Sequence, residues 1–112
     1  EIDCIVEGAP KLLNSSDLNK KILEFQPSFV LEVNRTKSEI DNFPEGMIHV
    51  SWLFDLWGRN PKNLNSDFIY TFAHSWLKNF SECPANHIEC LPPATDESIF
   101  TPIDVEKKFD FS

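Results

Sequence analysis

The stretch MIHVSWLF at residues 47–54 decides the fold, because it is the longest apolar run in this chain of 112 residues. Its side chains alternate between two faces, one with Ile48, Val50, Trp52 and Phe54 and the other with Met47, His49, Ser51 and Leu53. The shorter stretch FVLEV at residues 29–33 is also almost continuously apolar. Such runs are typical of strands in a parallel sheet that is covered on both faces. We therefore predict that both stretches are central strands of one parallel sheet.

The rest of the chain alternates between short strands and helices. Further strands are predicted at residues 2–6, 68–72 and 87–91, each followed by a break rich in Gly, Pro or polar residues. Helices are predicted from Ser15 until Pro27, and from His74 or Ser75 until Pro84. No internal repeat is visible in the sequence. The alternation predicts an α/β fold, with a mostly parallel sheet of about five strands and helices against its faces.

Composition and charge narrow the class of protein. A hydrophobic content of 41% and a charged content of 25% are typical of one compact globular domain. The formal net charge of −8 repels a phosphate backbone, so nucleic acid is not an expected partner. No apolar run approaches the roughly 20 residues that cross a bilayer, so no membrane span is expected.

The cysteines indicate a reducing compartment. Cys4, Cys83 and Cys90 are an odd number in a chain large enough to fold without covalent staples. We predict free thiols and a cytoplasmic protein, with a bridge between Cys83 and Cys90 as the alternative. We interpret three glycosylation-type triplets as chance. The spacing of Cys83, His87 and Cys90 supplies only three metal ligands, and strand alternation sends the last two to opposite faces. No metal site is expected.

Three segments of the sequence carry a resemblance to a known family. They are FVLEVNR (29–35) with WLFDLW (52–57), DFIYTF (67–72) with Ser75, and IECLPPATD (88–96) with Phe100 and Pro102. Through these segments the stretch from residue 29 to 102 resembles the N-terminal domain of GT-B glycosyltransferases, particularly the CgeB-like or family 1 glycosyltransferases. The chain departs from the family in having no Gly-rich turn after its first predicted strand.

The resemblance implies a fold and an activity. The fold would be a Rossmann-like three-layer sandwich over residues 1–102, the acceptor-side half of a GT-B architecture, with an interdomain linker over 103–112. A second domain would hold most contacts to the nucleotide-sugar donor, so this half alone would be inactive. The implied reaction moves a sugar to a hydroxyl-bearing acceptor without a further cofactor or a metal. The implied partners are that acceptor and the second domain.

Candidate site residues follow the predicted strands, because ligands of parallel sheets bind beyond the carboxyl ends of the strands. Asp55 is placed to act as a general base, although a loop aspartate that caps amides is an equal alternative. His74 is the second catalytic candidate, and its alternative is an exposed residue at a helix start. The predicted substrate-binding residues are Asn34, Arg35, Trp57, Arg59, Ser75 and Asp96. We expect Asp55, Arg59, His74 and Ser75 to surround one open depression.

A second hypothesis belongs to a different functional class. A non-catalytic acidic α/β domain would bind a protein partner through its acidic surface and exposed aromatic residues such as Trp57 and Phe100. A glycosyltransferase half should leave Asp55 and Ser75 open at the carboxyl edge, whereas an interaction domain should bury them. His49, in the middle of a strand, is interpreted as a hydrogen-bonded core residue.

Overall fold

The computed structural model describes residues 13–56, 58–94, 96 and 98. In chain order its elements are α1 (Ser15–Phe25), β1 (Phe29–Val33), the 3₁₀ helix η1 (Lys37–Glu39), β2 (Ile48–Leu53), η2 (Pro61–Asn63), β3 (Phe68–Thr71), η3 (His74–Phe80) and β4 (His87–Cys90). The strand predicted at residues 2–6 and the linker predicted at 103–112 lie outside the described residues. The helix predicted after the third strand is present as η3, a 3₁₀ helix.

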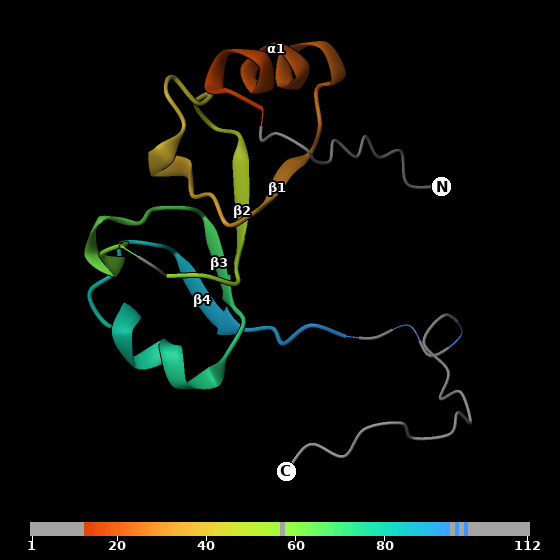
Figure 1. Ribbon diagram of the computed structural model, residues 1–112. Helices are drawn as coiled ribbons and strands as arrows, with labels where there is room; N and C mark the ends of the chain where they lie inside the picture. The colour runs from red at the N-terminus through yellow and green to blue at the C-terminus, as the bar shows by residue number, and fades with distance from the viewer. Residues whose placement is uncertain (1–12, 57, 95, 97, 99–112) are drawn as a thin grey trace.

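The four strands form one parallel sheet in the order β1-β2-β3-β4 (Figure 1). Phe29 pairs with Ile48 in a parallel register, so β1 and β2 belong to one parallel sheet as predicted, and they are neighbours in it. The prediction of an α/β fold with a parallel sheet is confirmed. The order is sequential, so the described strands have no point at which the direction of winding reverses, as it does in a doubly wound sheet. Strand β1 lies at one edge of the described sheet, so the prediction that residues 29–33 form a central strand is wrong for the described residues.

The register of the sheet contains a repeat. Paired residues are 19 positions apart between β1 and β2, 18 between β2 and β3, and 19 between β3 and β4. Each coil consists of a strand, a 3₁₀ helix and a return, and the coils stack as in a solenoid. The amino-acid sequence has no visible repeat of this length, so the repeat is one of structure. The repeat is hidden because equivalent positions hold different residue types, as where Val30 pairs with His49 and Ser51 with Ile69.

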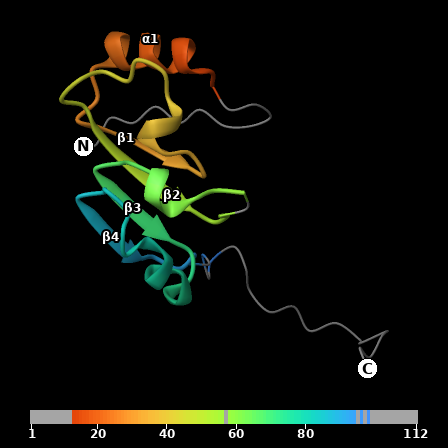
Figure 2. The ribbon, with the colours of Figure 1, turned by 90° about the vertical axis from the view of Figure 1, so that its left-hand side faces the viewer.

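The connections all lie on one side of the sheet. Figures 1 and 2 show the three 3₁₀ helices on the same side, and α1 at the end of the stack next to β1. Within the described residues no helix covers the opposite side, so the described structure has two layers and lacks the third layer of the predicted sandwich. No helix in this part of the chain is long and apolar enough to cross a membrane.

Helix α1 forms where the sequence supplies a cap and an apolar stripe. The side chain of Asn14 accepts a hydrogen bond from the amide of Asp17 at 2.8 Å, which satisfies one of the free donors at the helix start. Leu18 and Ile22 lie four residues apart on one face and are both buried. The helix ends at Phe25. Its C-cap residue, Gln26, donates its amide to the carbonyl of Ile22, and its left-handed backbone (φ 51°) directs the chain away from the helix.

The interior contains two apolar clusters and a polar band. The first cluster joins α1 to the first coil through Leu18, Ile22, Val30 and Ile40. The second lies under the later coils and contains Leu53, Leu64, Ile69 and Phe80. The polar band consists of the buried residues Thr36, His49, Ser51, Ser66 and Thr71.

Candidate functional site

Three predicted site residues meet at the carboxyl ends of β1 and β2. Asn34 has a left-handed backbone (φ 58°), and its side-chain oxygen accepts a hydrogen bond from the amide of Phe54 at 2.7 Å. Arg59 donates to the carbonyl oxygens of Asn34 and Asp55, and its Nε lies 3.4 Å from a carboxylate oxygen of Glu39. These contacts hold the loop after β2 against the loop after β1. Asn34 and Arg59 are therefore engaged by the protein itself.

A shallow depression of about 590 Å³ lies beside this loop. It is lined by Phe54, Asp55, Leu56, Gly58, Trp76 and Asn79. Of the four residues that we expected to surround one depression, Asp55 alone is among the lining residues. His74 and Ser75 begin η3 and are exposed, and Arg59 has the contacts described above. The lining of the depression thus contains one carboxylate, one side-chain amide and the aromatic rings of Phe54 and Trp76.

The remaining predicted site residues are separated from this edge. Arg35 points into the molecule, where its Nε donates to both carboxylate oxygens of Glu32 at 3.0 and 3.1 Å. Its side chain is only 12% exposed. Asp96 is exposed and accepts hydrogen bonds from the amide and hydroxyl of Ser98. Trp57 and Phe100 lie outside the described residues.

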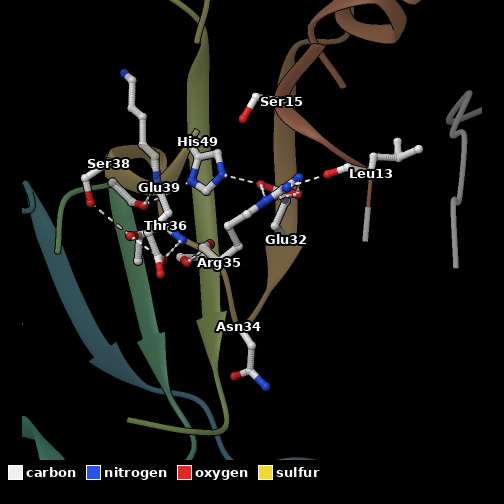
Figure 3. A network of polar contacts seen from close by, with 12 residues as sticks. Leu13, Ser15, Glu32, Asn34, Arg35, Thr36, Ser38, Glu39 and His49 are labelled. Carbon is white, nitrogen blue, oxygen red and sulfur yellow. Dashed lines mark hydrogen bonds and ion pairs between the residues drawn. The ribbon is translucent and has the colours of Figure 1, made fainter. Parts of the chain in front are cut away.

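His49 and Ser66 of the polar band form a chain of three side chains with Glu32, and Figure 3 shows the contact between His49 and Glu32. His49 Nε2 lies 3.0 Å from a carboxylate oxygen of Glu32, and His49 Nδ1 lies 3.0 Å from Ser66 Oγ. Arg35 binds the same carboxylate and also donates to the carbonyl of Leu13. The network therefore ties β1, β2, the loop before β3 and the segment before α1 together. The interpretation of His49 as a hydrogen-bonded core residue is confirmed.

The Ser-His-Glu order is that of a hydrolytic triad, but the surroundings are those of a structural network. His49 and Ser66 are 0% and 1% exposed. Ser66 Oγ donates to the carbonyl of Asn65 at 2.8 Å and accepts from the amide of Lys37 at 3.1 Å. A nucleophile needs access to substrate and a free lone pair aimed at it. Ser66 Oγ has neither, so the network carries no hydrolytic chemistry.

Two carboxylates of the network are held in their charged form. Burial raises the pKa of Glu32, but the hydrogen bonds from His49 and Arg35 outweigh it and keep that pKa below its ordinary value. Burial likewise raises the pKa of Asp67. The hydrogen bonds from the His49 amide, at 2.8 Å, and from Lys37 outweigh this effect, so the pKa of Asp67 also lies below its ordinary value. Both carboxylates therefore stabilise the fold while ionised.

Sequence reasoning missed this network in part. A signal existed for Glu32, because a charged residue in an apolar strand is buried only when it is paired. No signal identified Ser66, which precedes β3 and meets His49 only because successive coils stack.

The outward face of the sheet is the side that carries no connections. Two rows of side chains cross all four strands in register: Leu31, Val50, Phe68 and His87 in one row, and Val33, Trp52, Tyr70 and Glu89 in the other. Phe29 and Ile48 extend this face at the amino ends of the strands, and Phe54, Phe72 and Leu91 at the carboxyl ends. We call these residues the outward face.

The outward face is apolar and open. Phe29 and Leu31 are 54% and 55% exposed, and Val33, Ile48, Phe68, Phe72 and Leu91 are also exposed. The expectation that β1 and β2 are covered on both faces is therefore wrong for the described structure. In β2 the side with His49 and Ser51 is buried, and the more apolar side with Val50 and Trp52 faces outward. The connections between the strands all run along the inner side of the stacked coils. The outward face therefore stays open even though many of its residues are apolar.

The cysteines in the described structure are thiols. Cys83 and Cys90 are both free, as predicted, and Cys4 lies outside the described residues. The Sγ of Cys83 donates to the carbonyl of Leu64 at 3.1 Å. Within residues 13–56 and 58–94 no three His, Cys, Asp or Glu side chains gather as potential metal ligands.

Comparisons with protein families, with curated proteins and with solved structures find no match for this chain. Its function is therefore argued from its own residues.

Proposed function

We propose that this chain is a non-catalytic protein-interaction domain that binds an apolar protein surface on its outward face. The observation that carries the proposal is the continuous set of exposed apolar side chains on one side of the sheet. Scattered apolar residues on a surface are ordinary, but a contiguous apolar patch marks an interaction surface. Here seven large apolar side chains of the strands and the residues that follow them are at least 36% exposed.

Contacts on the inner side of the sheet hold in place the strands that carry the outward face. The strands are held by the parallel ladder and by the buried network of Glu32, His49 and Ser66 on their inner side. Trp52 is fixed further by a hydrogen bond of 2.8 Å from its Nε1 to the carbonyl of Leu91. A surface whose side chains are already ordered loses less conformational entropy when it binds.

A glycosyltransferase acceptor domain is the second candidate function. The observation that favours it is the exposed Asp55 in a depression with Trp76 and Asn79, since aromatic and polar groups together suit a sugar. Against it, the described strands have no switch point, and His74 does not line the depression. Asp55 and Ser75 are both exposed, which by the criterion given above favours the acceptor domain. That criterion supposes an interaction surface at the carboxyl edge, whereas the exposed apolar side chains lie on the outward face. We therefore rank the acceptor domain second.

Peptide selection tests the interaction domain. Short random peptides are selected on the immobilised protein, and their affinity is measured by titration against the wild type and Leu31→Asp. We expect apolar peptides whose affinity falls on the order of 100-fold in the variant, because a charge replaces a buried apolar contact. Leu23→Asp is the matched control, since Leu23 is 68% exposed on α1, away from the outward face.

Two results would contradict the proposal. One is that the selected peptides bind the wild type and Leu31→Asp equally. The other is that small sugars, titrated against the protein, shift the NMR signals of the residues that line the Asp55 depression and lose this effect in Asp55→Asn, while no peptide is selected. The second result would support the glycosyltransferase candidate.

A further inference from the structure

We infer that the depression beside Asp55 is a binding site for a guanidinium group, carried by an arginine side chain of the protein partner. The inference rests on the proposed function, because the arginine belongs to the partner that binds the outward face. It follows from the placement of the groups that line the depression, their hydrogen-bonding character and the charge around them.

The depression lies between the carboxyl end of β2 and one side of η3. The residues that follow β2 contribute Phe54, Asp55 and Leu56, and η3 contributes Trp76 and Asn79. In a 3₁₀ helix, side chains three positions apart lie one above the other, so Trp76 and Asn79 share the side of η3 that borders the depression. The loop after β2 thus supplies a carboxylate, and η3 supplies an indole ring and an amide.

Two aromatic rings line the depression, and a third connects them. The ring of Phe72 contacts both, with its centroid 5.6 Å from that of Phe54 and 6.2 Å from that of Trp76. These contacts order the two rings before a ligand binds. The planar guanidinium of arginine stacks on aromatic rings and is attracted by their electron-rich faces, whereas the ammonium of lysine is a compact, strongly hydrated charge. The rings therefore favour arginine over lysine.

The polar side chains of the depression are mainly hydrogen-bond acceptors. The carboxylate of Asp55 only accepts, and the amide group of Asn79 accepts through its oxygen and donates through its nitrogen. Both side chains are exposed and can be reached by a ligand. A guanidinium has five N–H donors and no acceptor, and its fork matches the two oxygens of a carboxylate. Sugar hydroxyls also accept, and they need more donors than these two side chains offer.

The charge in and around the depression is negative. Of the described residues that line it, Asp55 alone carries a formal charge, and the chain has a net charge of −8. Arg59, which donates to the carbonyl of Asp55, does not line the depression, and its Nε lies 3.4 Å from a carboxylate oxygen of Glu39. An acidic protein attracts basic partners and repels acidic ones. Charge and aromatic rings thus select the same ligand.

The depression adjoins the outward face. Phe54 belongs to both, and Phe72 of the outward face contacts Trp76 of the depression. A partner that lies on the outward face can therefore place one side chain in the depression without a further contact surface. The expected partner segment combines apolar residues with one arginine.

Titration with ethylguanidinium, followed by the NMR signals of the backbone amides, tests the depression by itself. We expect the signals of Leu56, Gly58 and Asn79 to shift with a Kd on the order of millimolar, and the neutral isostere ethylurea to give no saturable shift. Asp55→Asn should weaken this binding on the order of 10-fold. Glu24→Gln is the matched control, because it removes one negative charge at a side chain of α1 that is 63% exposed, and it should bind like the wild type.

The selected peptides test whether the partner carries the arginine. We expect arginine among them, and its replacement by the neutral isostere citrulline should weaken binding to the wild type on the order of 10-fold. In Asp55→Asn the same replacement should have little further effect, because the two changes remove one interaction. Circular dichroism checks that Asp55→Asn is folded, which the exposure of Asp55 leads us to expect.

The outcomes separate the arginine site from the interaction function. Ethylguanidinium that gives no saturable shift, or that binds Asp55→Asn as tightly as the wild type, overturns the inference, and so do sugars that occupy the depression in its place. Peptides that depend on Leu31 but bind equally with citrulline also overturn it and leave the interaction function standing. Ethylguanidinium binding without any selected peptide supports the guanidinium site and overturns the interaction function.

Discussion

His49 is the residue that joins Glu32 to Ser66 in the buried network. Its two ring nitrogens contact Glu32 and Ser66, and its backbone amide bonds Asp67. A buried polar group that loses its partner is costly, because water cannot replace the missing hydrogen bond. One ring thus determines whether two other buried groups are satisfied.

Replacing His49 should therefore destabilise the fold. In His49→Ala a cavity forms and Glu32 and Ser66 each lose a partner, so we expect the free energy of unfolding to fall by about 2 to 4 kcal/mol. Urea denaturation followed by circular dichroism measures it. His87→Ala is the control, because the His87 side chain is 47% exposed and its contacts with Glu89, Phe68 and Tyr70 lie at the surface, and we expect a loss below ~1 kcal/mol. Equal losses in the two variants would contradict a structural role for the network.

The carboxylates of the network predict a stability that depends on pH. The pKa of Glu32 is lowered from 4.5 and that of Asp67 from 3.8, so the folded state binds these protons less readily than the unfolded state. Their contribution is complete above these ordinary values and is lost as the pH falls through the lower values of the folded protein. We expect the urea midpoint to fall on acidification below about pH 4.5, and less steeply in Glu32→Gln. A midpoint that rises below that pH would contradict the assignment.

At the scale of the element, α1 covers the first coil with one face and exposes the other. Ile22 is 4% exposed and belongs to the first apolar cluster, whereas its neighbour Leu23 is 68% exposed. Helical spacing alone separates two adjacent residues of the same volume.

Truncating these neighbours should give unequal results. We expect Ile22→Ala to lower the free energy of unfolding by about 2 to 4 kcal/mol through a core cavity, and Leu23→Ala by less than ~0.5 kcal/mol. Thermal and urea unfolding of both variants provides the comparison. A loss in Leu23→Ala as large as in Ile22→Ala would mean that both faces of α1 are covered.

For strand β2, the sequence pattern predicted the extent of the strand but not the side that is buried. Its extent and its parallel pairing with β1 were predictable, because a long apolar run with β-branched and aromatic residues has few alternatives. Which side is buried was not predictable, since both sides contain apolar residues. The side with His49 and Ser51 is inside because hydrogen-bond partners from other coils are available there.

For the whole molecule, the binding of peptides without arginine to the outward face should respond little to salt. The face is mainly apolar, and added salt screens charges while it leaves apolar contacts intact. We expect the Kd of such selected peptides to stay nearly constant when the ionic strength is raised from about 0.01 M, where the screening length is about 30 Å, to about 1 M, where it is about 3 Å. Titration at the two salt concentrations measures the change. Peptides of this kind that salt releases would instead be held by ion pairs, contrary to the proposed function.

The positions of the candidate site residues were likewise predictable only in part. Asn34, Asp55 and Arg59 follow neighbouring parallel strands and lie at the same edge of the sheet, whereas Arg59, His74 and Ser75, which were expected to surround one depression with Asp55, do not line it. Arg35 was assigned to the same edge, yet it follows Asn34 in the loop and turns inward to Glu32. A difference of one position in a loop changes the direction of a side chain, and no periodicity predicts that direction.

The amino-acid sequence by itself determined the class of this protein, the positions of α1 and four strands, and the parallel pairing of β1 with β2. Local propensity and apolar runs act over a few residues, so the order of residues is enough to reveal them. Only the tertiary structure decided that the strands stack in sequential coils of 18 or 19 residues, that Ser66 meets His49, and that an apolar face stays outward. These features depend on contacts between residues far apart in the chain, and such contacts exist only after the coils have stacked.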